Sequence, residues 1–223
     1  MAAYLYQIVY KEEQLKNLWP FAIPYWNKGL TIFFENTLIE ALVKESKVEK
    51  LAICSWKLKD KLQWNLAPPR SPEEITLEKL NSEYDVMPFT RNSKHHEMIG
   101  AASNWHPGFR EAMTKIVEGI GKKMPSEVKI PIYQNAFSAK REIYQDYVND
   151  YLSPAMELVK NDPEIYKLAT VDSHYTKLIR NDGASAEYLQ EKIGMPYYPL
   201  ITFILERLFS VYVHNKNIKV TFL

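Results

Sequence analysis

Two charged residues, Glu206 and Arg207, interrupt an otherwise apolar stretch near the end of the 223-residue chain. The apolar residues of 201–212 nearly encircle a predicted helix, so that helix should be largely buried. Because buried charges must be paired or must face a cleft, two interpretations stay open. The two residues form a structural ion pair, or Glu206 is a carboxylate that faces a cleft and is a candidate catalytic residue.

Polar residues also stand at the end of the short apolar run 51–56, which predicts a buried strand. Residues at the carboxyl ends of parallel strands line the ligand crevice of open α/β sheets. Ser55, Lys57 and Lys59 are therefore candidates to bind an anionic ligand, and the alternative is an exposed basic loop. Cys54 is expected to be a small buried hydrophobic residue rather than a nucleophile.

Glu83 and Asp85 have the acid-x-acid spacing that places two carboxylates on one face of an extended segment. Such a pair could hold Mg²⁺ or Mn²⁺ against a diphosphate, which makes Asp85 a metal candidate. The pair precedes its predicted strand, however, so a capping or turn role is favoured. The adjacent histidines of 95–97 diverge by about 100° on a helix, so a solvated helix start is expected there rather than a zinc site.

The segment 133–137 places two amides between aromatic residues within a predicted strand. Buried amides need hydrogen-bond partners, and the neighbouring rings offer stacking surfaces. Tyr133 and Asn135 are therefore candidates to bind a sugar or a base. The alternative is an edge strand whose amides face water.

The composition is poor in glycine and rich in aromatic residues, with 7 Gly against 15 Tyr, 9 Phe and 5 Trp. Gly119 and Gly121 form the only close pair, without a third glycine or a following Ser or Thr. This pattern excludes the glycine-rich phosphate loops of dinucleotide-binding and P-loop proteins. The formal net charge of +1 gives no support to nucleic-acid binding, which usually relies on a basic face.

Several features indicate a cytoplasmic protein. A single cysteine cannot form an internal disulfide, which fits a reducing compartment. The first residues lack a basic, apolar leader. The apolar stretch 200–213 is too short and too charged to span a bilayer, so we expect no transmembrane segment.

Apolar periodicity, capping residues and prolines predict the elements that must position these candidates. Strands are expected over 4–10, 51–56, 85–89, 130–139 and 218–223. Helices are expected over 35–46, 71–81, 92–103, 106–121, 140–161 with a kink at Pro154, 162 onward, 184–194 and 199–213. An aromatic loop is expected over 17–30 and a turn over 181–183. This order favours an α/β fold with a mostly parallel central sheet flanked by helices, a helix-rich C-terminal third and a single domain over 1–223.

Seven segments, taken in chain order, resemble a family of glycosyltransferase-like proteins from bacterial capsule and surface-polysaccharide gene clusters, long described as a domain of unknown function. They are 6–10, 34–40, 51–56, 83–88, 105–108, 133–144 and 203–212. The last two match best. In 133–144 an asparagine, an aromatic residue and a basic pair recur, and in 203–212 the recurring core is Glu206-Arg207-Leu208.

The resemblance implies a GT-A-like fold, that of nucleotide-diphospho-sugar transferases. It also implies transfer of a sugar from a nucleotide-sugar donor to a glycan acceptor, with Mg²⁺ or Mn²⁺ or without a metal. Lys57 and Lys59 would then lie near the diphosphate, Tyr133 and Asn135 near the sugar, and Glu206 would be a cleft carboxylate. Such a protein works without nucleic acid and could associate peripherally with the inner membrane.

The sequence departs from this family in two places. Trp56-Lys57-Leu58-Lys59 stands where relatives often have a tyrosine and paired arginines, and lysine lacks the bidentate fork of arginine. No D-x-D follows the 51–56 strand. The alternative function is therefore a non-catalytic binding or assembly subunit with the same fold in a polysaccharide-synthesis complex.

Overall fold

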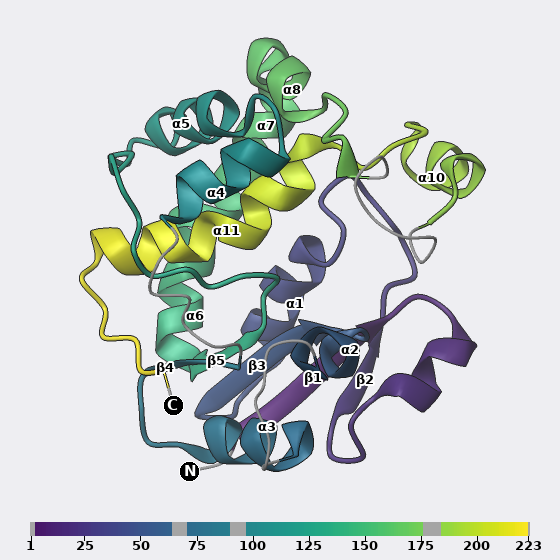
Figure 1. Cartoon of the computed structure of the whole chain (residues 1–223), viewed down its shortest axis with the longest axis vertical. Coiled ribbons are helices and arrows are strands. Elements are labelled where there is room, and N and C mark those ends of the chain that lie inside the picture. The colour runs from purple at the N-terminus through teal and green to yellow at the C-terminus, as the bar shows by residue number, and fades with distance from the viewer. Residues whose placement is uncertain (1–2, 64–70, 90–96, 176–183, 223) are drawn as a thin grey trace.

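One five-stranded sheet organises the chain, in the strand order β2-β1-β3-β5-β4. The structure is a computed structural model that describes residues 3–63, 71–89, 97–175 and 184–222. The strands are β1 (Ala3–Val9), β2 (Ile23–Trp26), β3 (Lys50–Ser55), β4 (Val86–Pro88) and β5 (Phe137–Lys140). Figure 1 shows them as an open sheet with helices on both sides. The α/β architecture expected from the sequence is confirmed.

The sheet is mixed, which corrects the expectation of a mostly parallel sheet. β1 pairs in parallel with β2 and β3, whereas β5 runs antiparallel to both β3 and β4. The chain returns to the sheet through 130–136 and enters β5 beside the end of β3, where the Cys54 thiol donates to the Asn135 carbonyl at 3.3 Å. Because β5 starts where β3 ends, it must run in the opposite direction.

The parallel strands bring their carboxyl ends to one edge of the sheet. Ile8 is in register with Ser55, and Val9 with Trp26. We call this the carboxyl edge, and the opposite edge, where β3 begins at Lys50, the amino edge. All six residues of β3 are buried, as the apolar run predicts, whereas β2 lies at the exposed side of the sheet.

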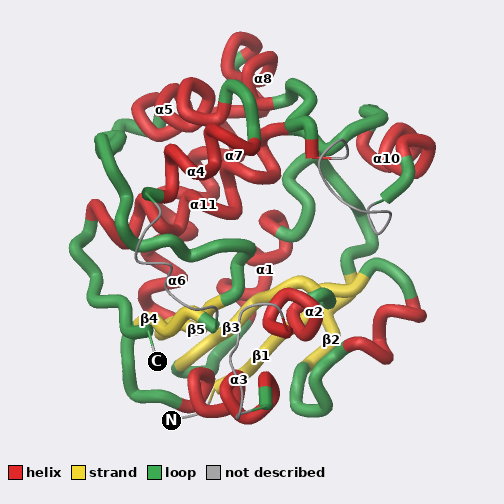
Figure 2. The backbone as a smooth tube through the Cα atoms, viewed as in Figure 1, coloured by secondary structure: helices red, strands yellow, loops and turns green. Residues whose placement is uncertain are grey.

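Helices cover both faces of the sheet (Figure 2). Alternate residues of β3 divide between two cores: Leu51 and Ile53 belong to the larger one, and Ala52 and Cys54 to the smaller one. The smaller core is closed by α2 (Leu58–Gln63) and α3 (Pro72–Asn81). The larger core is closed by α1 (Asn36–Glu45), α4 (Met98–Trp105), α5 (Phe109–Gly119), α6 (Arg141–Tyr147), α7 (Ser153–Asn161), α8 (Pro163–Ala169) and α11 (Leu200–Asn215). Three further segments are η1, a 3₁₀ helix (Glu12–Asn17), η2, a π-helical turn (Val148–Leu152), and α10 (Ala186–Ile193).

Local capping signals place several helix ends where the sequence predicts them. The Ser71 hydroxyl accepts from the Glu74 backbone N–H, which completes a capping box ahead of Pro72. The Asp162 carboxylate accepts from two backbone N–H groups at the start of α8. Gly194 ends α10 with φ of 74°, the left-handed conformation that glycine adopts without strain.

Other elements differ from the expectation. The strand expected over 130–139 is confined to β5, because Gln134 and Asn135 adopt φ of 62° and 53° and form a turn. The expected closing strand is reduced to one bridge between Val220 and Val86. The helix over 141–161 passes through η2 just before Pro154, which replaces the expected kink by a π-helical turn.

Three short elements were not expected from the sequence. β2 and the end of η1 lie within the predicted aromatic loop, and α2 follows β3 directly. The expected helix start at Asn92 or Ser93, the histidine pair at 95 and 96, and the turn over 181–183 lie outside the described residues.

Candidate functional site

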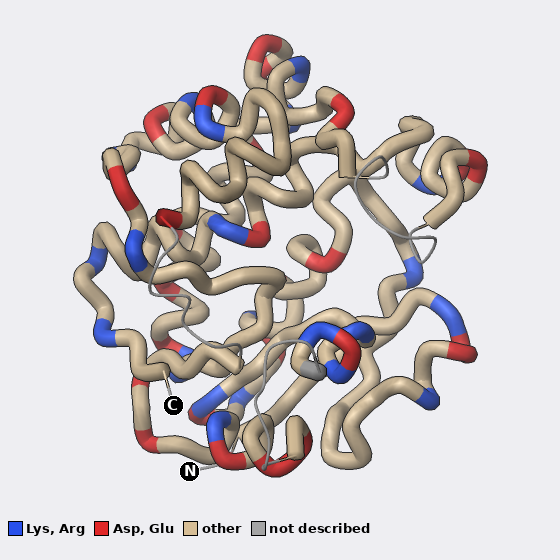
Figure 3. Tube along the Cα trace, in the orientation of Figure 1, with Lys and Arg blue, Asp and Glu red and all other residues tan. Residues whose placement is uncertain are grey.

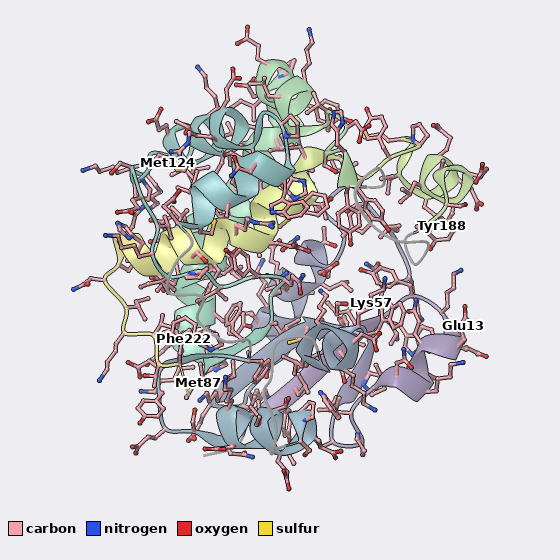
Figure 4. All side chains as sticks on the ribbon, in the orientation of Figure 1. Glu13, Lys57, Met87, Met124, Tyr188 and Phe222 are labelled. Atoms are coloured by element: carbon pink, nitrogen blue, oxygen red, sulfur yellow. The ribbon has the colours of Figure 1, made fainter. Side chains whose placement is uncertain are left out.

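A cavity of about 770 Å³ opens at the carboxyl edge of the sheet. Its lining comes from the segments that follow β1 and β3, from η1, from the start of α1, from α2 and α10, and from α11. Figure 4 labels three lining residues on different segments: Glu13 on η1, Lys57 after β3 and Tyr188 on α10. This position agrees with the rule that ligands bind open α/β sheets at the carboxyl ends of their strands.

Four lysines form the basic side of the cavity: Lys11, Lys16, Lys57 and Lys61. The Gln14 side-chain oxygen accepts from the Tyr10 backbone N–H at 2.7 Å, which fastens η1 to the end of β1. After β3, the Ser55 hydroxyl accepts from the Lys57 backbone N–H at 3.1 Å and bends the chain toward α2. Local hydrogen bonds at two strand ends therefore bring these lysines to one opening.

Two carboxylates, Glu35 and Glu206, line the same cavity on the side formed by α11 and by the segment before α1. Glu35 precedes α1, and its Oε2 accepts a hydrogen bond from the Tyr10 hydroxyl at 3.0 Å. The Glu206 side chain is 14% exposed. Burial raises the pKa of Glu206, the Lys61 and Arg207 cations oppose the rise, and the Glu35 charge adds to it. Burial and the neighbouring Glu35 also hold the pKa of Tyr10 well above its usual value.

Glu206 and Arg207 are adjacent on α11 and have different surroundings: Glu206 lines the cavity, and Arg207 does not. The Arg207 guanidinium packs against the rings of Phe109 and Tyr133, 5.6 Å from each ring centre. One of its nitrogens donates to the Phe203 carbonyl at 2.9 Å and lies 3.6 Å from Glu206 Oε2. Both interpretations from the sequence therefore describe part of the arrangement: the ion pair is present, and Glu206 also lines the cavity.

Aromatic rings line much of the side of the cavity that contains Glu35 and Glu206. Phe34 stacks on Tyr198 with ring centres 5.5 Å apart, and Tyr175 lies 5.3 Å from Tyr198 and 5.1 Å from Phe203. Phe34 has a backbone φ of 50°, a conformation that costs free energy in a non-glycine residue. Such strain is concentrated at ligand sites, so this backbone geometry is consistent with a binding role.

The predicted site residues separate into two groups. Ser55, Lys57 and Glu206 line the cavity together. Lys59, on α2, is not among its lining residues, and its ammonium lies 4.8 Å from the centre of the Trp19 ring. Tyr133 packs on Arg207 and is likewise absent from the lining.

Asn135 lies beside the end of β3 and does not line the cavity. It is 2% exposed, and its carbonyl oxygen accepts from the Cys54 thiol. Its side-chain nitrogen is buried without a hydrogen-bond partner in the described structure. Burial raises the pKa of Cys54 to about 12, so this thiol is the inert buried residue that the sequence indicates.

Asp85 lies at the amino edge, away from the cavity. Its carboxylate pairs with the Lys140 ammonium at 2.6 Å, and Lys140 is in register with Lys50 at the start of β3. In the described part of the chain, no group of three or more His, Cys, Asp or Glu side chains could hold a metal ion. Asp85 is therefore an ion-paired residue at the amino edge and does not line the cavity.

The chain was compared with family models, curated proteins and solved structures. None of them matches. No helix within the described residues is long and apolar enough to cross a membrane. The cavity geometry and the family-like sequence segments are therefore the two grounds for a functional argument.

Sequence reasoning missed Glu35, Tyr10 and three of the four cavity lysines. Glu35 occupies the N-cap position of α1, yet its side chain makes no capping hydrogen bond. Glutamate is not among the residues favoured there, so this mismatch was the signal available in the sequence. η1 and the end of β3 line one cavity because of the tertiary structure, and no local sequence pattern predicts this.

Proposed function

We propose that the protein transfers a sugar from a nucleotide-sugar donor to a bacterial surface-polysaccharide acceptor, and that the cavity at the carboxyl edge is its active site. The observation that carries this proposal is the meeting of Lys57, Ser55 and the buried Glu206 in one cavity. Cations suit a departing diphosphate, and a buried carboxylate suits an acceptor hydroxyl. The segments 51–56 and 203–212, which resemble the glycosyltransferase-like family, support the same function.

The reaction makes one bond and breaks one bond at the anomeric carbon of the donor sugar. The bond from that carbon to the diphosphate oxygen breaks, and its electron pair leaves on the diphosphate. The acceptor hydroxyl oxygen forms the new bond while its proton passes to the Glu206 carboxylate. Lys57 and Lys61 stabilise the charge that develops on the diphosphate.

The size and lining of the cavity support a ligand of this kind. Its volume of about 770 Å³ falls within the range of roughly 300–1,000 Å³ that is usual for small-molecule sites. The rings of Phe34, Tyr198 and Phe203 offer flat apolar faces for a base or a sugar. We assign charge stabilisation to Lys57 and Lys61, which line the cavity.

We extend the proposal to the fold and to the compartment. An open α/β sheet with its cavity at the carboxyl edge is consistent with a GT-A-like architecture. A lone, buried cysteine is consistent with work in the reducing cytoplasm, beside the inner membrane on which surface polysaccharides are assembled.

Isothermal titration against a panel of UDP-, GDP- and TDP-sugars tests the proposal, followed by turnover assays with the donor that binds. We expect one donor class to bind. Lys57→Met should weaken that binding about tenfold, because it removes a charge-assisted contact. Lys59→Met is the matched control, since Lys59 lies two positions along and outside the cavity lining.

The outcomes separate the proposal from its alternatives. Absence of binding by any donor at millimolar concentration would overturn it. If Lys57→Met and Lys59→Met weaken donor binding equally, the cavity is not the donor site. Tight donor binding without turnover, together with a stoichiometric partner, would favour the non-catalytic subunit.

A further inference from the structure

The cavity contains a second carboxylate that the proposed transfer does not use. Glu35 is only 8% exposed, and it lines the same cavity as Glu206. We propose that Tyr10 and Glu35 form a positioning pair that holds a second carboxylate in the cavity that Glu206 lines, so that the site works with two carboxylates. The catalytic meaning of this pair rests on the proposed function, whereas its effect on Glu206 can be measured in the free protein.

The side chain of Glu35 is directed to the cavity rather than to its own helix. The backbone of Glu35, rather than its side chain, bonds to α1: its carbonyl accepts from the Leu38 and Ile39 N–H groups. Its carboxylate instead contacts Tyr10, which lies 25 positions earlier in the chain. The strained backbone of Phe34 immediately precedes it.

Tyr10 holds this carboxylate from a rigid position. It directly follows β1, and its backbone N–H donates to the Gln14 side chain at 2.7 Å. Its hydroxyl donates to Glu35 Oε2 at 3.0 Å. This hydrogen bond fixes the position of the Glu35 carboxylate in the cavity.

Charged groups from three elements act on Glu206. Lys61, on α2, and Arg207, on α11 itself, favour its ionised form, whereas Glu35, before α1, disfavours it. Burial has the largest effect and also disfavours the charge. Lys57 is the other cation that lines the cavity near the end of β3. Further titratable side chains of the lining are Tyr10, Lys11, Glu13, Lys16, Tyr175, Tyr188 and Tyr198.

This balance gives Glu35 a defined role. A general base is most effective when its proton affinity lies near the working pH. Without Glu35, the two cations would hold Glu206 as a weaker base. The negative charge of Glu35 raises the affinity of Glu206 for the acceptor proton.

Carbon-13 NMR of glutamate-labelled protein, recorded without any donor, tests the inference. The Glu206 carboxyl signal is assigned by its loss in Glu206→Gln, and its titration midpoint is then compared among variants. We expect Glu35→Gln to lower the midpoint and Tyr10→Phe to lower it less. Glu35→Asp keeps the charge and should leave the midpoint near that of the wild type.

Glu13→Gln is the matched control, because it removes another carboxylate that lines the cavity but belongs to η1. An unchanged midpoint in Glu35→Gln would overturn the inference, and so would an equal decrease in Glu13→Gln. Because no donor is present, this result is independent of whether nucleotide sugars bind. If turnover is found, the acidic limb of its pH profile should move to lower pH in Glu35→Gln.

Discussion

The two edges of the sheet both contain charged residues (Figure 3). They differ in what surrounds those residues. At the amino edge the Lys50 ammonium donates to the Ser82 carbonyl and hydroxyl oxygens, each at 2.7 Å. At the carboxyl edge, Lys57 and Glu206 face a cavity large enough for a ligand. The comparison shows that a partly or fully buried charge indicates a site only where the chain leaves room for a partner molecule.

Lys79 is a second example of a charge that the chain itself satisfies. It is 1% exposed, and its ammonium donates to the Pro88 and Phe89 carbonyl oxygens at 2.8 and 3.2 Å. These bonds fasten α3 to the end of β4. We therefore expect substitutions at Lys50 and Lys79 to change stability, and substitutions at Lys57 and Glu206 to change binding or turnover.

The largest expected effect is that of Glu206→Gln. Loss of the general base should lower the turnover rate by about 10²–10⁴-fold, while donor affinity stays near that of the wild type. Initial rates and isothermal titration on the same preparations measure the two quantities. A rate within a few-fold of the wild type would show that Glu206 does not accept the acceptor proton.

Outside the cavity lining, Lys79→Met should lower the free energy of unfolding by about 1–3 kcal/mol, because two buried carbonyl oxygens lose their donor. Urea unfolding followed by circular dichroism measures the change. Donor affinity should be unaffected. A stable variant with weakened donor binding would contradict the division between charges that the chain itself satisfies and charges that face the cavity.

A smaller effect is expected in the pH dependence of stability at Lys50. Burial lowers the pKa of Lys50 from 10.5 to about 8, with Asp85 opposing and Lys140 adding to the decrease. The folded chain therefore releases this proton before the unfolded chain does, and the cost of burying the charge disappears as the pH rises from about 8 to 10.5. The contribution of Lys50 to the free energy of unfolding should rise over that window.

The contribution of Lys50 is measured as the difference between the wild type and Lys50→Met, from denaturant unfolding at several pH values. Using the difference cancels the buried tyrosines, whose raised pKa values act on stability in the alkaline range in both proteins. A difference that is flat or falls between pH 8 and 10 would contradict the assignment.

The smallest expected effect is that of Asp85→Asn. The Asp85–Lys140 pair is exposed to solvent, so its loss should change the free energy of unfolding by about 0–1 kcal/mol. Turnover should stay as in the wild type, because the pair lies at the amino edge. A loss of turnover comparable to that of Glu206→Gln would show that Asp85 contributes to the reaction.

Local patterns predicted the elements whose signals lie within a few residues. The capping box at Ser71, the Asp162-Pro163 start and the glycine stop at Gly194 all lie where the sequence indicates. The apolar run of β3 correctly predicted a strand covered on both faces. Ser55 and Lys57 could be proposed because the strand end itself positions them.

Residues positioned by long-range contacts could not be predicted in this way. Glu35 becomes a cavity residue through Tyr10, and that contact depends on how α1 packs beside β1. Asn135 does not line the cavity, because two successive residues with left-handed backbone conformation turn the chain into β5. The antiparallel direction of β5 likewise depends on the returning chain and not on its own sequence.

The central claim is that the carboxyl edge, rather than the amino edge, binds the nucleotide sugar. Backbone-amide NMR during titration with the donor that binds tests it most directly. We predict that the largest shifts occur at Ser55, Lys57 and the residues of α11 around Glu206, while Lys50, Lys79 and Asp85 stay unchanged. Shifts centred on the amino edge, or no shifts at millimolar donor, would contradict the claim.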